Sequence, residues 1–140
     1  MLYLDTSVLV AAITPEAESR RVQSWLRNVG SGDLAISNWV ATEFASALSI
    51  KVRTGVLTMR QREDAARIFE SVAGSTFQRF AIDPRHFQLA TRFCDNVAAK
   101  LRGGGALHLA VASDNRATLC TLDRRLVEGG SALGVATLLP

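Results

Sequence analysis

The chain has 140 residues, enough for one domain with its own hydrophobic core, and its 48% hydrophobic and 21% charged residues are typical of a globular protein. Sixteen basic against thirteen acidic residues give a net charge of +3, which suits a polyanionic partner without requiring one. No uncharged run of about 18 apolar residues and no signal-peptide pattern is present. We therefore expect a soluble, cytoplasmic protein without a membrane partner.

Short apolar strands alternate with helices along the chain. The apolar run 1–4 stops at Asp5, and Thr6 and Ser7 suit the start of a helix because short hydroxyl side chains are preferred there. Strands are expected at 1–4, 34–37, 76–82, 117–121 and 134–139. Helices are expected at 6–13, 16–29, 39–53, 58–72, 83–97 and 106–114, and a short one between the last two strands.

Local signals set several of these expected helix ends. Asn38 is expected to cap the helix at 39–53. The glycine triplet 103–105 is expected to precede a helix that begins at Ala106, and residues 129–131 are expected to separate the last strand from what comes before it.

The alternation favours an α/β fold, a three-layer α/β/α structure whose central parallel sheet has about five strands. No repeat, low-complexity tract or linker divides the chain, so residues 1–140 are expected to form a single domain. In open α/β sheets, ligands bind in the crevice beyond the carboxyl ends of the strands. Asp5, at such an end, is therefore the first candidate for chemistry, although Asp5-Thr6-Ser7 is also explained as a turn with a helix N-cap.

Most of the thirteen acidic residues have a solvent-facing explanation, on arginine-rich helices or in turns. These include Glu16, Glu18, Asp33, Glu63, Asp64, Glu70, Asp83, Asp95 and Asp114. Asp5, Glu43 and Asp123 differ, because each follows a strand or lies in an otherwise apolar helix. Carboxylates that converge on one crevice repel each other unless a cation neutralises them, and hard oxygen ligands suit Mg²⁺ or Mn²⁺.

With these acids in place, the sequence resembles the PIN-domain family of metal-dependent ribonucleases, and within it the VapC-type toxins of bacterial toxin–antitoxin pairs. The resemblance covers essentially the whole chain. Four stretches carry it, in this order and with these separations: Tyr3-Leu4-Asp5-Thr6-Ser7, Ser37 through Glu43, Leu101 through Ala112, and Thr121-Leu122-Asp123.

The resemblance implies four acids around one or two divalent ions, Mg²⁺ or Mn²⁺. The first acid corresponds to Asp5, the second to Glu43 and the fourth to Asp123. Thr121 and Ser7 are the hydroxyl residues expected to assist them.

The third family acid should stand directly before Ala106-Leu107-His108-Leu109-Ala110, where this chain has Gly105. An Asp there would both cap the helix and ligate the metal. Two explanations stay open: the natural protein has lost the ligand, or an Asp→Gly change was introduced to silence a toxin during its expression. The three intact acids and the intact flanking motif favour the second.

The function that the resemblance implies is that of an endoribonuclease toxin that hydrolyses RNA phosphodiesters, with activity impaired by Gly105. The acids would hold the ion, and a water of lowered pKa would attack phosphorus in line. Arg102 is a candidate contact to the RNA backbone. The resemblance also implies a homodimer and a cognate antitoxin, whose segment would lie between the helices 16–29 and 39–54.

Two other functions stay open at this stage. The first is a catalytically degenerate PIN module that keeps the antitoxin contacts and acts as a binding or regulatory protein. The second, a phosphatase with Asp5 as nucleophile, is weaker, because Ser7 stands where a second Asp is needed and the only lysines are Lys51 and Lys100.

Several features invite a functional interpretation that their context does not favour. His108 lies on an apolar helix and is expected to be a packed histidine rather than a catalytic base. Trp25 and Trp39 have core spacing and are expected to be structural or to lie at a protein interface. Cys94 and Cys120 are expected to be small apolar fillers rather than a disulfide or a metal pair.

Overall fold

The computed structural model describes residues 1–140, apart from the side chain at position 31. Five parallel strands form one sheet in the order β3-β2-β1-β4-β5. The strands are β1 Leu2–Leu4, β2 Leu34–Ser37, β3 Gln78–Phe80, β4 Thr118–Cys120 and β5 Thr137–Leu138. The predicted three-layer α/β/α fold with a parallel sheet of about five strands is confirmed.

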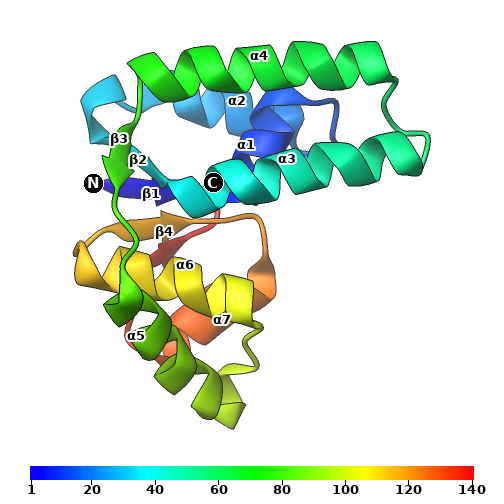
Figure 1. Ribbon diagram of the computed structural model, residues 1–140. Helices are drawn as coiled ribbons and strands as arrows, with labels where there is room; N and C mark the ends of the chain where they lie inside the picture. Colours follow the sequence, from blue (N-terminus) through cyan, green and yellow to red (C-terminus); the bar gives the residue numbers. More distant parts are fainter.

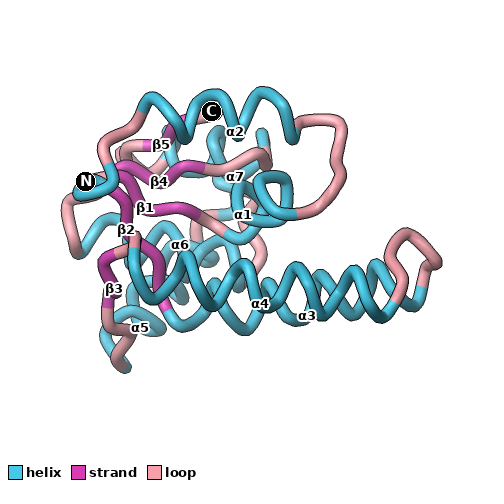
Figure 2. The backbone as a smooth tube through the Cα atoms, turned by 90° about the horizontal axis from the view of Figure 1, so that it is seen from above, coloured by secondary structure: helices cyan, strands magenta, loops and turns pink.

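Helices cover both faces of this sheet (Figure 1). The four helices on one side are α1 Thr6–Ile13, α2 Ser19–Asn28, α3 Asn38–Arg53 and α4 Met59–Ser75. The three on the other side are α5 Pro84–Asp95, α6 Gly103–Asp114 and α7 Arg124–Ala132. Two single-turn 3₁₀ segments, η1 Ser31–Asp33 and η2 Val97–Ala99, lie in the connections. Seen from above, the α3–α4 hairpin extends well beyond the sheet (Figure 2).

The core is formed by the central strands and by α6. Every residue of β2 is buried, and α6 is buried without interruption from Ala106 to Ala112. A helix that is apolar on all sides needs neighbours on all sides, and α6 has the sheet on one face and α5 on the other. This explains why its sequence lacks the polar stripe of a surface helix.

The order of the strands creates a crevice between β1 and β4. The chain builds β1, β2 and β3 outward in one direction and then returns to place β4 on the other side of β1. Ligands bind at such a switch point in doubly wound sheets. Leu4 pairs with Cys120, and the Asp5 amide donates a 3.0 Å hydrogen bond to the Cys120 carbonyl, so β1 and β4 end side by side. Asp5 and Thr121, the residues that follow these strands, are therefore neighbours.

The expectations for two glycine-rich stretches were wrong. Residues 129–131 lie inside α7, and the triplet 103–105 forms the first turn of α6. In α7 the missing side chains allow close packing: a Cβ at Gly129 would lie 2.9 Å from the Ala99 carbonyl oxygen, and one at Gly130 would lie 2.4 Å from Thr137 Cγ2. The glycines there serve helix packing rather than chain reversal.

Three smaller expectations also need correction. The third strand is confined to Gln78–Phe80, because α4 continues to Ser75. Ser37, rather than Asn38, occupies the N-cap position of α3. Cys120 is buried as expected, whereas Cys94 is exposed, because it lies on the solvent-facing side of α5.

Within the part of the chain that the structure describes, none of the helices has the length and apolar character needed to span a bilayer.

Replacing Gly129 by Ala should lower the free energy of unfolding by about 1–3 kcal/mol, because the added methyl group meets a backbone oxygen that cannot move aside. Gly74→Ala is the matched control, since Gly74 is also helical and has open space around its Cα. That change should raise stability by about 0.5–1 kcal/mol through helix propensity. Urea unfolding followed by circular dichroism measures both, and equal effects would contradict the packing role of Gly129.

Candidate active site

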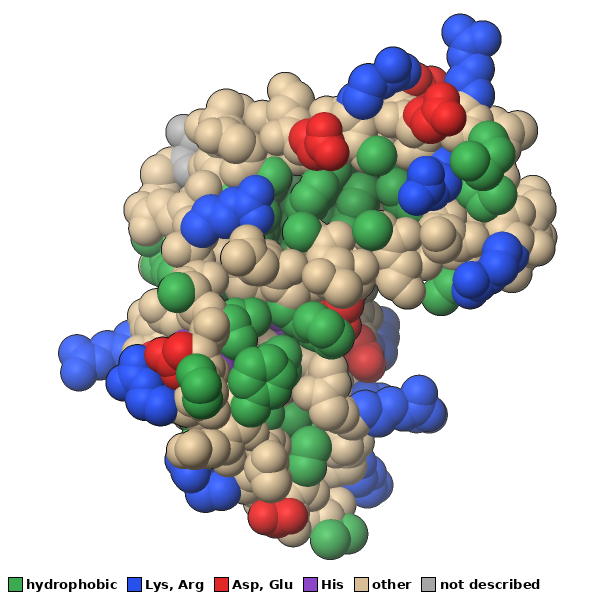
Figure 3. Space-filling view, viewed as in Figure 1, with side chains coloured by type: hydrophobic (Ala, Val, Ile, Leu, Met, Phe, Trp, Pro, Cys, Tyr) green, Lys and Arg blue, Asp and Glu red, His purple; other side chains and the backbone are tan. Residues whose placement is uncertain are grey.

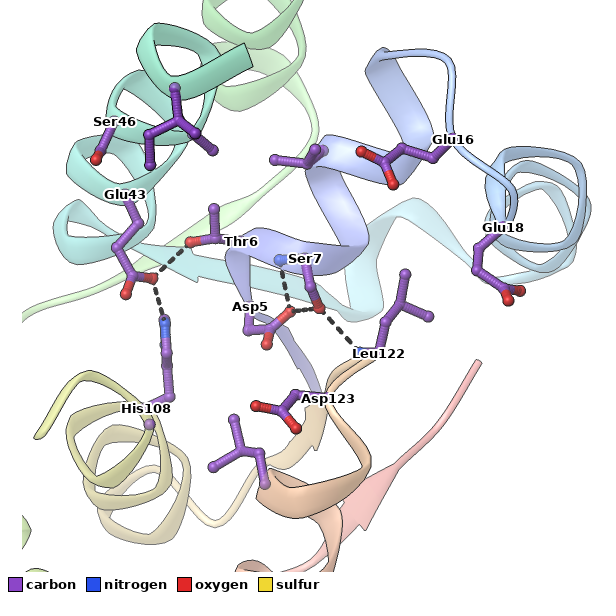
Figure 4. A pocket seen from close by; sticks show the side chains of 15 residues that line it. Asp5, Thr6, Ser7, Glu16, Glu18, Glu43, Ser46, His108, Leu122 and Asp123 are labelled. Carbon is purple, nitrogen blue, oxygen red and sulfur yellow. Dashed lines mark hydrogen bonds and ion pairs between the residues drawn. The ribbon is translucent and has the colours of Figure 1, made fainter. Parts of the chain in front are cut away.

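A pocket of about 630 Å³ opens at the carboxyl ends of β1 and β4, and we call it the acid pocket. Its walls come from α1, α3, α6 and the start of α7, and it is lined by Asp5, Thr6, Ser7, Val10, Glu16, Glu18, Glu43, Ser46, Ala47, Ile50, Gly105, His108, Leu122, Asp123 and Leu126. The three predicted acids thus share one pocket. Asp5, Glu43 and Asp123 gather at one end of it, whereas Glu16 and Glu18 lie at the other (Figure 4).

Asp5 is the buried centre of the site, with 5% of its surface exposed. Its Oδ1 atom accepts hydrogen bonds from the Ser7 amide (2.9 Å), the Val8 amide (3.2 Å) and the Ser7 hydroxyl (2.6 Å). Asp5 is therefore the N-cap of α1, as one interpretation of the sequence held, and the carboxylate also faces the acid pocket. Asp5 is thus both the helix N-cap and the candidate site residue that the sequence offered as alternatives.

Thr121 and Ser7 connect Asp5 to the fourth acid. The Thr121 hydroxyl donates a 2.6 Å hydrogen bond to Asp5 Oδ2 and accepts one from the Asp123 amide at 3.0 Å. The Ser7 hydroxyl accepts a hydrogen bond from the Leu122 amide at 2.9 Å. Together these bonds fix the turn between β4 and α7 against the start of α1. Asp123 is exposed and caps α7 by accepting a hydrogen bond from the Arg125 amide.

Glu43 reaches the pocket from α3 and is held there from two sides. Its Oε2 atom accepts a 2.6 Å hydrogen bond from the Thr6 hydroxyl, and His108 Nε2 lies 2.7 Å from the same oxygen. Because a carboxylate only accepts, the His108 nitrogen is the donor. His108 is 3% exposed, so it is packed as predicted, but its ring also contacts a candidate metal ligand.

A buried hydrogen-bonded chain supports His108 from behind. His108 Nδ1 lies 3.0 Å from the Tyr3 hydroxyl, which lies 2.7 Å from the Ser37 hydroxyl. The hydrogen-bonded chain thus extends from Ser37 through Tyr3 and His108 to Glu43. The roles of Tyr3 and Thr6 and the contact of His108 with Glu43 were not predicted from the sequence. A signal was available, because a tyrosine in a buried strand and a histidine on an apolar helix both need polar partners.

Burial and these contacts shift the pKa values of the two inner acids in opposite directions. Burial raises the pKa of Asp5, and the nearby His108 together with the bonds from Ser7 and Thr121 offsets part of that rise. Partial burial also acts to raise the pKa of Glu43, but the hydrogen bond and charge of His108, aided by Thr6, outweigh it. The pKa of Glu43 therefore lies below its usual value.

Gly105 lines the acid pocket at the position where the family pattern has its third acid. It is the third residue of α6, so an Asp there would lie in the first helical turn and would not be the N-cap that the sequence suggested. A Cβ on Gly105 would lie 3.1 Å from Leu126 Cδ1, the tip of a side chain that can shift by a few tenths of an ångström. A Cβ at position 105 therefore fits once Leu126 moves.

The donor type in the acid pocket fits a hard divalent cation, because the carboxylates of Asp5, Glu43 and Asp123 face one space. The number of donors falls short. Among the residues that the structure describes, no three His, Cys, Asp or Glu side chains stand close enough to hold a metal ion as they are. Gly105 shares the pocket wall with Glu43 and Asp123 and supplies no side-chain donor.

Arg102 lies at a second hollow, of about 420 Å³, that shares Glu43, Gly105 and Asp123 with the acid pocket. Its side chain is exposed directly before α6. The predicted RNA-contacting residue is therefore placed beside the acids.

Comparison with known proteins agrees with this geometry. The PIN domain family model matches residues 2–130. Among solved structures, FitAcB from Neisseria gonorrhoeae is similar with 18% identity and a TM-score of 0.76, covering 100% of this chain and 98% of that one. The Mycobacterium tuberculosis toxin VapC20, described as cleaving the sarcin–ricin loop, has 17% identity, a TM-score of 0.74 and full coverage of both chains.

A third similar structure is VapBC2 from Rickettsia felis, bound to a DNA fragment from its promoter. It has 19% identity and a TM-score of 0.66, and the match covers 99% of this chain and 98% of that one. At such low identity these likenesses concern the fold. No curated protein sequence matches the chain.

In EDTA, Asp5→Asn should remove a pH dependence of stability that the wild-type protein shows. The raised pKa means that the folded state binds more protons than the unfolded state between the unfolded and folded pKa values. Wild-type stability should therefore fall as pH rises through that window, and the variant should lose this fall. Denaturant unfolding as a function of pH measures the difference. Parallel pH profiles for the two proteins would contradict the effect.

His108→Ala should raise the pKa of Glu43, because it removes the hydrogen bond and the nearby charge that lower it. The change is followed by carboxyl-carbon NMR titration in EDTA. His86→Ala is the control, since His86 is equally buried but bonds to the Asp83 amide. An unchanged Glu43 pKa in His108→Ala, or an equal change in both variants, would show that His108 does not set the charge state of Glu43.

Proposed function

The chain belongs to the PIN domain family, and on that premise we propose that it is a metal-dependent endoribonuclease toxin whose catalytic set is incomplete at Gly105. The observation that carries the proposal is the convergence of Asp5, Glu43 and Asp123, from distant parts of the chain, on one pocket at the switch point of the sheet. RNA is the proposed substrate, supported by the description of the similar VapC20 as a toxin that cleaves the sarcin–ricin loop.

Asp5, Glu43 and Asp123 are the residues proposed to hold Mg²⁺ or Mn²⁺. When bound, such an ion lowers the pKa of water and stabilises the charge that develops on the phosphate. The protein orients the acids: Thr121 and Ser7 fix Asp5, and Thr6 and His108 aim Glu43 into the pocket. Because His108 is itself held by Tyr3, the orientation of Glu43 depends on packing inside the core.

A second candidate function is a degenerate PIN module that binds its antitoxin without cleaving RNA. Two observations favour it. Gly105 supplies no donor, and both oxygens of Asp5 and the Oε2 atom of Glu43 already accept hydrogen bonds from the protein. Such carboxylates are satisfied without an ion. Cleavage separates the two candidates, whereas antitoxin binding belongs to both.

The antitoxin is proposed to occupy the part of the acid pocket that leads away from the acids. Val10 on α1 faces Ala47 and Ile50 on α3 there, and Glu16 and Glu18 lie at the end. An apolar segment with basic side chains complements that lining. The helix α2, expected to form one wall, begins only at Ser19, so α1 and the turn after it take this place. The similar structures include a toxin–antitoxin complex from Klebsiella pneumoniae. A homodimer is proposed from the resemblance to VapC-type toxins alone.

Gly105→Asp should produce RNA cleavage that depends on Mn²⁺ or Mg²⁺ and exceeds that of the present chain by orders of magnitude. The added carboxylate completes the donor set in the acid pocket. Gly103→Asp is the matched control: it adds the same charge to the first turn of α6, where a side chain meets open space outside that pocket. Cleavage of a labelled RNA with and without EDTA measures the effect.

Equal activity of the two variants, or activity of Gly105→Asp in EDTA, would contradict the proposal. So would a Gly105→Asp protein that folds but neither binds Mn²⁺ nor cuts RNA. If the contact with Leu126 prevents folding, Gly105→Asp combined with Leu126→Ala removes that contact and repeats the test.

A further inference from the structure

The second hollow differs from the acid pocket in the charge of its walls. Lys100, Arg102 and Arg125 line it, together with Glu43, Leu101, Gly104, Gly105, Asp123 and Leu126. We call the surface formed by Lys100, Arg102 and Arg125 the basic cleft. Lys100 and Arg102 lie in the connection before α6, whereas Arg125 lies in the first turn of α7, so only the fold brings the three cations together.

The three cations of the basic cleft are exposed and uncommitted. Elsewhere, Arg21, Lys51, Arg67 and Arg85 are in ion pairs with acidic neighbours. Within the described part of the chain, Lys100, Arg102 and Arg125 form no such pair. Lysine and arginine side chains that carry no protein partner are available to neutralise phosphates. Figure 3 shows acidic side chains in the waist between the two helical layers and basic ones projecting beside them from the lower half.

The backbone in the same hollow favours an anion as well. The α6 helix begins at Gly103 without a side-chain cap, so the amide groups of its first turn lack the hydrogen-bonding partner that a capping side chain supplies. Gly104 and Gly105 add no side chains there, although Glu43 Oε1 lies close to Gly104, 3.1 Å from where its Cβ would be. The positive end of α6 therefore adds to the field of the three cations.

The two openings that meet at the acids thus suit different ligands. The acid pocket away from Asp5 is lined by apolar residues and by Glu16 and Glu18, which are paired with Lys51 and Arg21, so it offers no unpaired cation to a polyanion. The basic cleft offers three unpaired cations beside the same Glu43 and Asp123.

We propose that a single-stranded RNA reaches the acids through the basic cleft, with Lys100, Arg102 and Arg125 each neutralising a backbone phosphate. This inference rests on the proposed ribonuclease function and names the path of its substrate. The contacts are to phosphates, so they position the strand without reading its bases. The strand and the antitoxin segment then enter the site from opposite ends and compete only at the acids.

Binding of a fluorescent single-stranded RNA to the untagged chain tests the proposal, measured by anisotropy in EDTA over a series of KCl concentrations. Each neutralised phosphate contributes about 0.7 to the slope of log K against log salt. The variant Lys100→Gln/Arg102→Gln/Arg125→Gln should therefore lose about 2 from that slope. The control Arg20→Gln/Arg53→Gln/Arg60→Gln removes three exposed arginines from the other helical layer and the same net charge, and should keep the wild-type slope.

An unchanged slope in the basic-cleft variant, or an equal loss in the control, would overturn the proposal. Cleavage by Gly105→Asp is measured separately, so the two proposals fail independently. If the basic-cleft variant loses the expected slope but Gly105→Asp cuts no RNA, the nuclease proposal is rejected and the RNA-binding surface is kept. Cleavage by Gly105→Asp with an unchanged slope would reject the surface and keep the nuclease.

Discussion

A buried carboxylate has to be satisfied by hydrogen bonds, and the site depends on how the fold meets this requirement at Asp5. The helix α1, which follows β1, supplies two amide groups, and the residue that follows the neighbouring β4 supplies the Thr121 hydroxyl. The same bonds fix the turn that carries Asp123. The hydrogen bonds that satisfy Asp5 therefore also position Asp123, so these candidate site residues are part of the structural framework.

A second set of bonds positions Glu43 from the other side. It runs from Ser37 through Tyr3 and His108, which means that α3, β1, β2 and α6 all contribute to one side-chain orientation. Buried polar networks of this kind are costly when one member is missing, because each remaining group loses its partner. The network therefore constrains the sequence at positions that never touch a substrate.

Gly105 changes the electrostatic balance of this arrangement. With three acids instead of four, repulsion within the pocket is smaller, and the hydrogen bonds from Thr6, Ser7, Thr121 and His108 satisfy the inner two. The inner acids are therefore stable without an ion, and in the proposed nuclease this stability comes at the expense of a metal ligand. Such a trade between stability and activity is common at catalytic sites. The 17–19% identity to similar structures shows that the fold persists across large differences in sequence.

From the sequence alone, the alternation of apolar strands with helices determined the layers and the parallel sheet, and strand-end positions singled out Asp5 and Asp123. Local pattern sufficed there because burial leaves a periodic signal. Three things were decided only by the tertiary structure. One is the hydrogen bonding of His108 and Tyr3, whose partners lie 65 and 34 residues away. Another is the helical state of the glycines in α6 and α7.

The third is the basic cleft. Arg102 was a candidate RNA contact from the sequence, whereas Lys100 and Arg125 were not, because an exposed Lys or Arg carries no signal of what lies beside it. The glycines in α7 are explained by close packing. A glycine in the sequence suggests a turn, and only the structure shows that neighbouring segments lie too close for a side chain. Contacts between distant residues depend on the topology, and the order β3-β2-β1-β4-β5 is what places the acids, their hydrogen-bond donors and the cations around one crevice.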